Sequence, residues 1–151
     1  MSSYQFELAL RQYVAAFDGG NTNKISPEEF KTRFDNLYHK DFTYTSKDGL
    51  KLTREQVYER EVQKLADGGT TVTLVHFRKI GLDCMDVKLG IVNGDEKRTV
   101  RAVSTISAGK AVFSKEIDET KLFRPAGQVI GAKCTNFVYK WQEFGTFQTN
   151  M

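Results

Sequence analysis

The hydrophobic period of the chain changes once, near residue 70, and this change constrains the fold more than any other feature. Before it, apolar residues recur at helical spacing, first as Phe6, Leu10, Tyr13, Val14 and Phe17. After it, segments rich in Val, Ile, Thr and Phe follow one another at spacings that suit successive hairpins: 71–80, 82–92, 96–107 and 110–117. Helices followed by a run of strands predict an α+β fold.

Start and stop signals delimit three helices. Gly19-Gly20 ends the first, and Ser26-Pro27 with Glu29 predicts the N-cap, first turn and capping partner of the second. Thr53 with Gln56 predicts a capping box for the third. The expected apolar faces are Phe30, Phe34, Leu37 and Tyr38 in the second helix, and Val57, Tyr58, Val62 and Leu65 in the third.

The remaining local signals describe a sheet with two different faces. Phe42–Tyr44 alternates as a short strand. Asn93-Gly94-Asp95 predicts a hairpin turn, because Asn-Gly accepts the positive φ values that a type I′ turn requires, and a further turn is expected at Ala108-Gly109. Met85, Val87, Leu89 and Ile91 alternate with Asp86 and Lys88. We therefore expect an antiparallel meander with one wet face and one face covered by the helices.

Length and composition limit the other possibilities. At 151 residues the chain fits a single domain, 1–151, with a core of about 4–118 and a C-terminal extension over 119–151 that contains a possible extra strand. The net charge of +3 comes from scattered residues, and neither a membrane-spanning stretch nor a secretion signal is recognisable, so we expect no nucleic-acid or membrane partner. Cys84 and Cys134 form no metal-binding or redox motif, which predicts free buried thiols and a cytoplasmic location.

Three segments resemble the SnoaL-like branch of the nuclear transport factor 2-like superfamily, over about residues 4–118: RQYVAAFDGGN, FDNLYHKDFTYTSKDG and ISAGKAVFSKEID. The resemblance implies a strongly curved antiparallel sheet that forms a cone, with three N-terminal helices at its mouth and an apolar pocket inside. It also implies a homodimer. Because this superfamily includes isomerases, cyclases, dehydratases and non-catalytic adaptors, function has to be argued from the site.

Tyr13 has a functional and a structural interpretation. Its segment resembles the part of ketosteroid isomerases that carries a tyrosine donor to an enolate, a role suited to a phenol in a dry pocket. Tyr13 also belongs to the apolar stripe of Leu10 and Phe17, so it can be a core residue. The carboxylate base expected after the DFTYTS segment is replaced by Thr45-Ser46, which argues against steroid-type isomerisation.

Two further candidates lie on strands. Arg101 alternates with Thr99, Val103 and Thr105; facing inward it would bind an anion or pair with Asp86 or Asp83, and facing outward it would be solvated. His76 is a possible acid or base because its ordinary pKa is near neutrality, or else a hydrogen-bonded sheet residue.

The predicted ligand-binding residues are aromatic or apolar and are expected to shape the pocket walls: Phe17, Tyr38, Tyr44, Tyr58, Phe77 and Met85. The segment Asp18–Glu29 imitates a calcium-binding loop, but Gly20, Thr22 and Asn23 occupy positions that need oxygen ligands or glycine. We expect no metal and no cofactor.

These patterns favour a protein that binds a small amphipathic molecule, or a cofactor-free isomerase, cyclase or dehydratase that acts on one. Tyr13 would then donate a hydrogen bond, His76 would transfer protons and Arg101 would anchor the ligand. The alternative is a non-catalytic oligomerisation or adaptor module, which the apparent lack of a carboxylate base favours.

Overall fold

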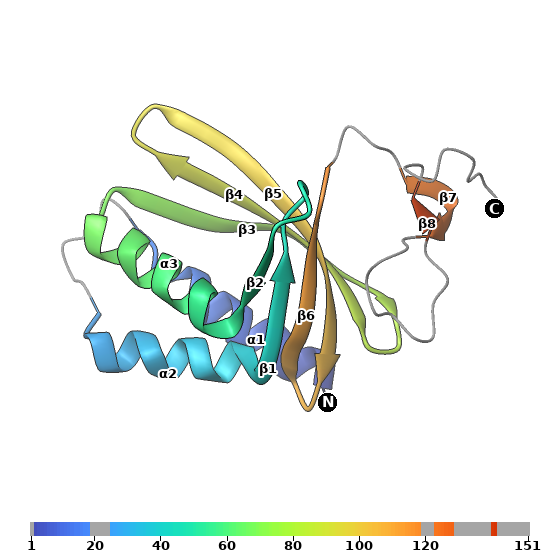
Figure 1. The fold of residues 1–151 in the computed structure, drawn as a ribbon, viewed down its shortest axis with the longest axis horizontal. Helices are drawn as coiled ribbons and strands as arrows, with labels where there is room; N and C mark the ends of the chain where they lie inside the picture. The colour runs from blue at the N-terminus through green and yellow to red at the C-terminus, as the bar shows by residue number, and fades with distance from the viewer. Residues whose placement is uncertain (1, 19–24, 119–122, 129–139, 142–151) are drawn as a thin grey trace.

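The computed structural model describes residues 2–18, 25–118, 123–128 and 140–141. Its helices are α1 (Ser2–Val14), α2 (Pro27–Leu37) and α3 (Arg54–Asp67). Its strands are β1 (Tyr38–Thr45), β2 (Lys51–Thr53), β3 (Thr70–Gly81), β4 (Cys84–Asn93), β5 (Glu96–Ser107), β6 (Lys110–Ile117), β7 (Phe123–Gln128) and β8 (Lys140–Trp141). The α+β prediction of three helices and a curved sheet is confirmed (Figure 1).

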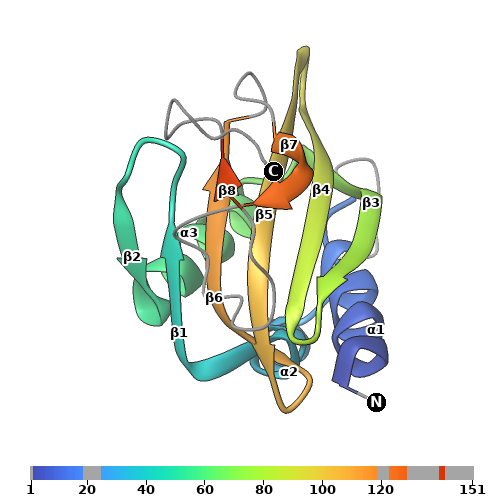
Figure 2. The same cartoon turned by 90° about the vertical axis from the view of Figure 1, so that its right-hand side faces the viewer.

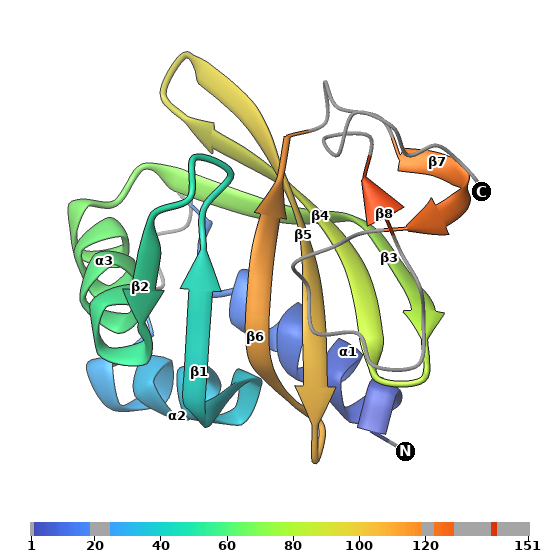
Figure 3. The same ribbon diagram turned by 45° about the vertical axis from the view of Figure 1, so that its right-hand side comes forward.

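Six strands form one open sheet in the order β2-β1-β6-β5-β4-β3. Strands β3 to β6 make the predicted antiparallel meander, whereas β1 pairs with β6 in parallel. Figures 1 and 3 show the sheet curving around the three helices, which all lie on its concave side. The sheet does not close, so the cone is open between its two edge strands, β2 and β3.

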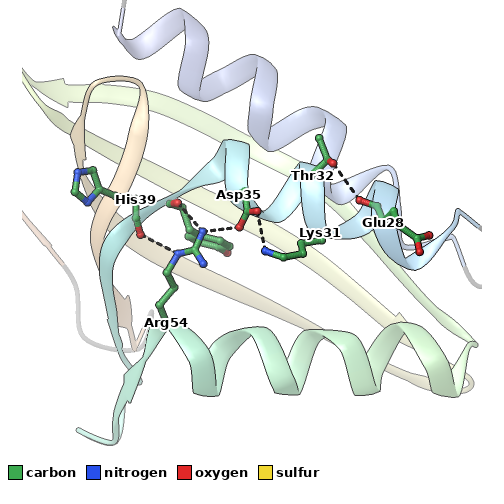
Figure 4. A network of polar contacts seen from close by, with 7 residues as sticks. Glu28, Lys31, Thr32, Asp35, His39 and Arg54 are labelled. Carbon is green, nitrogen blue, oxygen red and sulfur yellow. Dashed lines mark hydrogen bonds and ion pairs between the residues drawn. The ribbon is translucent and has the colours of Figure 1, made fainter.

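The predicted N-caps of α2 and α3 are present, whereas α1 already ends at Val14 and the predicted stop at Gly19-Gly20 lies outside the described residues. Ser26 Oγ accepts a hydrogen bond from the Glu29 backbone N–H, and Thr53 and Gln56 form a reciprocal capping box at α3. The end of α2 is stabilised by Arg54, whose guanidinium donates to the carbonyl oxygens of Tyr38 and His39 and to Asp35 (Figure 4). These contacts satisfy the carbonyl group of Tyr38, the residue that follows the last turn of α2, and that of His39 in β1, and they fasten α3 to α2 and β1.

The core lies between the helices and the concave face of the sheet. Aromatic rings dominate it: Tyr13 packs against Phe17 and Phe30, and Phe34 packs against Tyr38. Val62 was predicted on the buried face of α3 but is 37% exposed. Residue 62 is one position beyond Glu61, and successive residues are turned by about 100° around a helix, so Val62 lies to the solvent side of the face that Val57, Glu61 and Lys64 present to the cavity.

The two predicted hairpin turns are present, but the Asn93-Gly94 prediction is one residue out of register. Asn93 pairs with Glu96, so the central residues are Gly94 and Asp95, and only Gly94 has a positive φ, of 63°. A type I′ turn needs positive φ at both central residues. That pattern occurs instead at Ala108-Gly109, with φ values of 53° and 78°.

The C-terminal extension contributes a separate two-stranded sheet, β7-β8. Figure 2 shows this pair in front of the face of the main sheet that lies opposite the helices. The possible extra strand, predicted over 129–141, is observed only as Lys140–Trp141, and residues 129–139 lie outside the described part of the chain. Among the described residues, no helix has the length and apolarity needed to cross a membrane.

Cys84 is fully buried in β4 but is not a free thiol, because it is disulfide-bonded. The prediction of free thiols is therefore wrong for Cys84, while Cys134 lies outside the described residues. Disulfide formation depends on how closely two cysteines approach in space, which their separation in sequence does not reveal. Free thiols therefore no longer support the predicted cytoplasmic location.

Candidate functional site

A cavity of about 430 Å³ lies between the helices and the concave face of the sheet. This volume is within the range of protein sites for small molecules. Its apolar walls consist of Phe6, Leu10, Val14, Phe17, Leu37, Phe42, Leu52, Val57, Val72, Val87, Leu89, Ile91, Val100, Ala102 and Ala111. Its polar lining consists of Tyr13, Tyr38, Tyr44, Ser46, Arg60, Glu61, Lys64, Arg98, Ser104, Ser114 and Glu116.

A tyrosine–glutamate pair connects α1 to α3 inside this cavity. The Tyr13 hydroxyl donates to Glu61 Oε1 at 2.7 Å, and Lys64 Nζ donates to Glu61 Oε2 at 2.9 Å. Glu61 follows Val57 by four residues, which places it on the helix face that packs against the core. Its carboxylate is therefore held from both oxygens at the wall of the cavity.

A second pair connects β1 to β6. The Tyr44 hydroxyl donates to Glu116 Oε1 at 2.6 Å. Tyr44 is opposite Ser114 in the parallel ladder, so Glu116 is its diagonal neighbour on the same face of the sheet. Ser114 in turn shares a hydrogen bond of 2.7 Å with Ser104 of β5. Three strands thus contribute polar groups to one side of the cavity.

The tyrosine hydroxyls in the cavity remain protonated at neutral pH. Burial raises the pKa of Tyr13 well above its usual value, and the negative charge of Glu61 raises it further. The pKa values of Tyr38 and Tyr44 are raised by burial in the same way, with contributions from Glu61 and, for Tyr44, from Glu116. All three side chains are therefore hydrogen-bond donors rather than phenolates.

Tyr38 differs from the other two tyrosines. Tyr13 and Tyr44 each donate to a carboxylate, but the Tyr38 hydroxyl has no hydrogen bond to any residue that the structure describes. Its ring is fixed against Phe34 and Phe42, at centroid distances of 4.6 Å and 4.4 Å. The hydroxyl is thus a positioned donor with its bonding capacity unused.

The predicted aromatic and apolar site residues divide into two groups in the structure. Tyr13, Phe17, Tyr38 and Tyr44 all line the cavity. Tyr58, Phe77 and Met85 pack in the hydrophobic core around it and are not among its lining residues: Tyr58 contacts Phe34, Phe77 contacts Phe6, and Met85 is 1% exposed.

Arg101 and His76 lie on the opposite face of the sheet from the cavity. The strand partners of Asp86 and Lys88 include Arg78, His76 and Arg101, and these residues alternate with the cavity-facing ones. Arg101 Nε donates to Asp86 Oδ1 at 2.9 Å, so Arg101 forms one of the two ion pairs considered from the sequence. His76 Nε2 lies 3.7 Å from Asp86 Oδ2, beyond hydrogen-bonding distance.

The structure supplies the carboxylates that sequence reasoning missed. The expected position after β1 holds Ser46, which accepts a hydrogen bond from the Leu50 backbone N–H. The acidic groups come instead from Glu61 on α3 and Glu116 on β6. Glu61 carried a signal, because a charged residue spaced four positions from both Val57 and Leu65 interrupts the apolar stripe.

Comparison with solved structures identifies the fold. A de novo designed protein, NT-9, matches with a TM-score of 0.56 and 16% identity, over 78% of this chain and 87% of the design. A nuclear transport factor 2-like protein of unknown function from Burkholderia xenovorans LB400 also has a TM-score of 0.56, with 14% identity over 99% of each chain. The chain has the nuclear transport factor 2-like fold.

A solved protein described as SnoaL-like is also similar in structure. This protein from Jannaschia sp. CCS1, described as a SnoaL-like polyketide cyclase, matches with a TM-score of 0.53 and 9% identity, over 77% of this chain and 86% of its own. At these identities the likeness shows the fold alone. No family model and no curated protein matches the chain.

The described residues contain no group of three or more His, Cys, Asp or Glu side chains arranged to hold a metal ion. Residues 19–24 of the calcium-like segment lie outside the described part of the chain. The described end of that segment is explained by helix capping, since Ser26 caps α2 and Glu29 Oε2 accepts a hydrogen bond from Arg33 Nε at 2.9 Å.

Proposed function

We propose that the protein binds a small amphipathic molecule in the cavity and transfers a proton on it without a cofactor. The observation that carries this proposal is Glu61, a carboxylate fixed by Tyr13 and Lys64 inside an apolar cavity. A cavity of about 430 Å³ with converging polar groups favours ligand binding over the alternative of an adaptor with a filled core.

The proposed chemistry uses the two groups that are best placed for it. Glu61 accepts a proton from a carbon next to a ligand carbonyl, and the Tyr38 hydroxyl donates a hydrogen bond to the carbonyl oxygen as negative charge develops there. Glu61 then returns the proton to another carbon of the same molecule, which isomerises the ligand with no net gain or loss of atoms. Tyr13 is a positioning residue in this scheme, because its hydroxyl donates to Glu61.

Deuterium exchange tests the proposed chemistry directly. The probe is beta-tetralone, an aromatic ketone with exchangeable protons, incubated with the protein in deuterated buffer and followed by NMR. We expect the wild-type protein to accelerate the exchange and Glu61→Gln to lower this acceleration by about 10²-fold or more, the usual contribution of a general base. Tyr38→Phe should also lower it.

The matched control is Glu59→Gln, an exposed residue of α3 that does not line the cavity. This variant should exchange the probe at the wild-type rate. Equal rates in the wild-type protein and in Glu61→Gln would refute the role of Glu61. The homodimer expected from the resemblance stays a separate prediction, which sedimentation of the purified protein would check.

A further inference from the structure

The cationic side chains of the cavity are arranged differently from its carboxylates. Glu61 and Glu116 each accept a hydrogen bond from a buried or half-buried tyrosine. Arg60 and Arg98 also line the cavity, yet both are exposed residues. The acidic groups are therefore tied to the phenols of the interior, while the two arginines border the cavity where it meets solvent.

The arginines are also the charged groups of the cavity without partners. Lys64 is paired with Glu61 at 2.9 Å, and Glu61 additionally accepts from Tyr13. Within the described part of the chain, neither Arg60 nor Arg98 forms an ion pair or a side-chain hydrogen bond. Their capacity to bind an anion is unused, and a guanidinium suits planar anions such as carboxylates because it donates two parallel hydrogen bonds.

The two arginines approach the cavity from different elements. Arg60 precedes Lys64 by one helical turn on α3, and Arg98 is opposite Ile91 on β5, near the end of the β4-β5 hairpin. Figure 1 shows α3 and the β4-β5 hairpin on the same side of the molecule. Each guanidinium is available to an anionic group at the border of the cavity, while the apolar part of such a ligand extends toward the aromatic walls.

We propose that the ligand of this cavity is an amphipathic carboxylate, with its acid group on Arg60 and Arg98 and its apolar body inside. This inference rests on the proposed function and adds the chemical class and orientation of the ligand. The charges favour this orientation over its reverse, because an anion placed deep in the cavity would meet Glu61 and Glu116. A cationic ligand would have to compete with the existing partners of Glu61.

The test compares three straight-chain probes of ten carbons each with different head groups: decanoate, decanol and decylamine. Calorimetric titrations of the full chain are made below the concentrations at which the probes aggregate. We expect decanoate to bind best, and Arg60→Gln and Arg98→Gln each to weaken it about threefold to tenfold, as befits partly solvated charge pairs. Decanol affinity should not change in either variant.

Lys97→Gln is the matched control, because it removes one positive charge from the adjacent residue of β5, an exposed side chain that does not line the cavity. It should leave decanoate binding unchanged. Added salt should weaken decanoate in the wild-type protein and leave decanol unaffected.

The outcomes separate this inference from the proposed function. Decanol or decylamine binding as tightly as decanoate, or decanoate binding that both arginine variants leave intact, would overturn the anionic ligand but not the cavity as a binding site. If none of the three probes binds, both proposals fail. Preference for decanoate that Arg60→Gln and Arg98→Gln reduce, and Lys97→Gln does not, supports the carboxylate.

Discussion

Replacing Tyr13 by Phe tests whether the Tyr13–Glu61 contact is a real energetic link between α1 and α3. The hydroxyl belongs to a residue that is 5% exposed and donates to Glu61 Oε1 at 2.7 Å. Hydrogen bonds to charged groups contribute about 1.5–3 kcal/mol to stability. Because the Glu61 side chain is 19% exposed and keeps Lys64, water can replace part of the lost bond.

We therefore expect Tyr13→Phe to lower the free energy of unfolding by about 1–2 kcal/mol, around the lower limit of that range. For a domain of this size the loss corresponds to a fall in Tm of about 2–8 °C. Urea denaturation and thermal unfolding both measure it. Tyr4→Phe is the control on the same helix, since Tyr4 is 65% exposed and its change should be within about 0.5 kcal/mol of zero.

A second background shows whether the charge of Glu61 is responsible. In a Glu61→Gln protein the amide oxygen can still accept from Tyr13, but a neutral acceptor gives a bond about half as strong. Tyr13→Phe should then cost about half as much as it does in the wild-type background. An equal cost in both backgrounds, or no cost in the wild type, would refute a charge-assisted bond between these residues.

Two further predictions concern the turn after β5 and the end of α2. Ala108→Gly should raise the free energy of unfolding by about 0.5–1 kcal/mol, because Ala108 has φ 53°, a conformation that costs most residues about 1–2 kcal/mol, while the greater freedom of glycine in the unfolded chain offsets part of the gain. Ala111→Gly, in strand β6, is the control and should lower stability. Urea denaturation that shows a loss of stability in both variants would contradict the argument. For Asp35, burial alone would raise the pKa, but hydrogen bonds from Arg54 and Lys31 lower it below its usual 3.8. The folded-state pKa is then below the unfolded one, so Asp35 stabilises the fold above about pH 4 and loses this effect as the pH falls through the folded-state value. Urea titrations should show Asp35→Asn less stable than the wild type at pH 7 by at most about 1 kcal/mol, with the difference shrinking toward pH 2, and a difference independent of pH would contradict the ion pair.

Local signals predicted most of the secondary structure. Ser26 and Thr53 mark their helix starts because capping is a contact between residues three apart, and the alternation of Val87, Leu89 and Ile91 separates the two faces of β4. The parallel pairing of β1 with β6 could not be predicted in this way. Tyr44 and Ser114, which are partners in that ladder, are seventy residues apart, and neither strand carries a signal that selects the other.

The site was predicted in part, and the missing part has a physical reason. Aromatic residues such as Phe17 and Tyr38 were expected in the pocket because apolar periodicity identifies the inner face. Arg101 belongs to the alternating set on the other face, where the fully buried Asp86 is its partner. The alternation of residues along a strand separates its two faces but does not say which face lines a cavity. It therefore could not decide whether Arg101 faces inward or outward.

Most polar groups of the cavity have hydrogen-bond partners within the described part of the protein, and a few have none there. The paired groups stabilise the fold, whereas the unpaired groups are available to a ligand. Tyr13 with Glu61, Tyr44 with Glu116, and Ser104 with Ser114 are pairs whose members come from different elements, so each pair stabilises the curved sheet and its helices without a ligand. The Tyr38 hydroxyl, Arg60 and Arg98 have no such partner among the described residues. A ligand gains most from groups whose hydrogen bonds it does not have to break, because a displaced partner would leave a buried polar group unpaired. Specificity should therefore depend on the unsatisfied groups and stability on the pairs, so Arg98→Gln should change affinity more than Tm, and Tyr13→Phe should change Tm even in the absence of ligand.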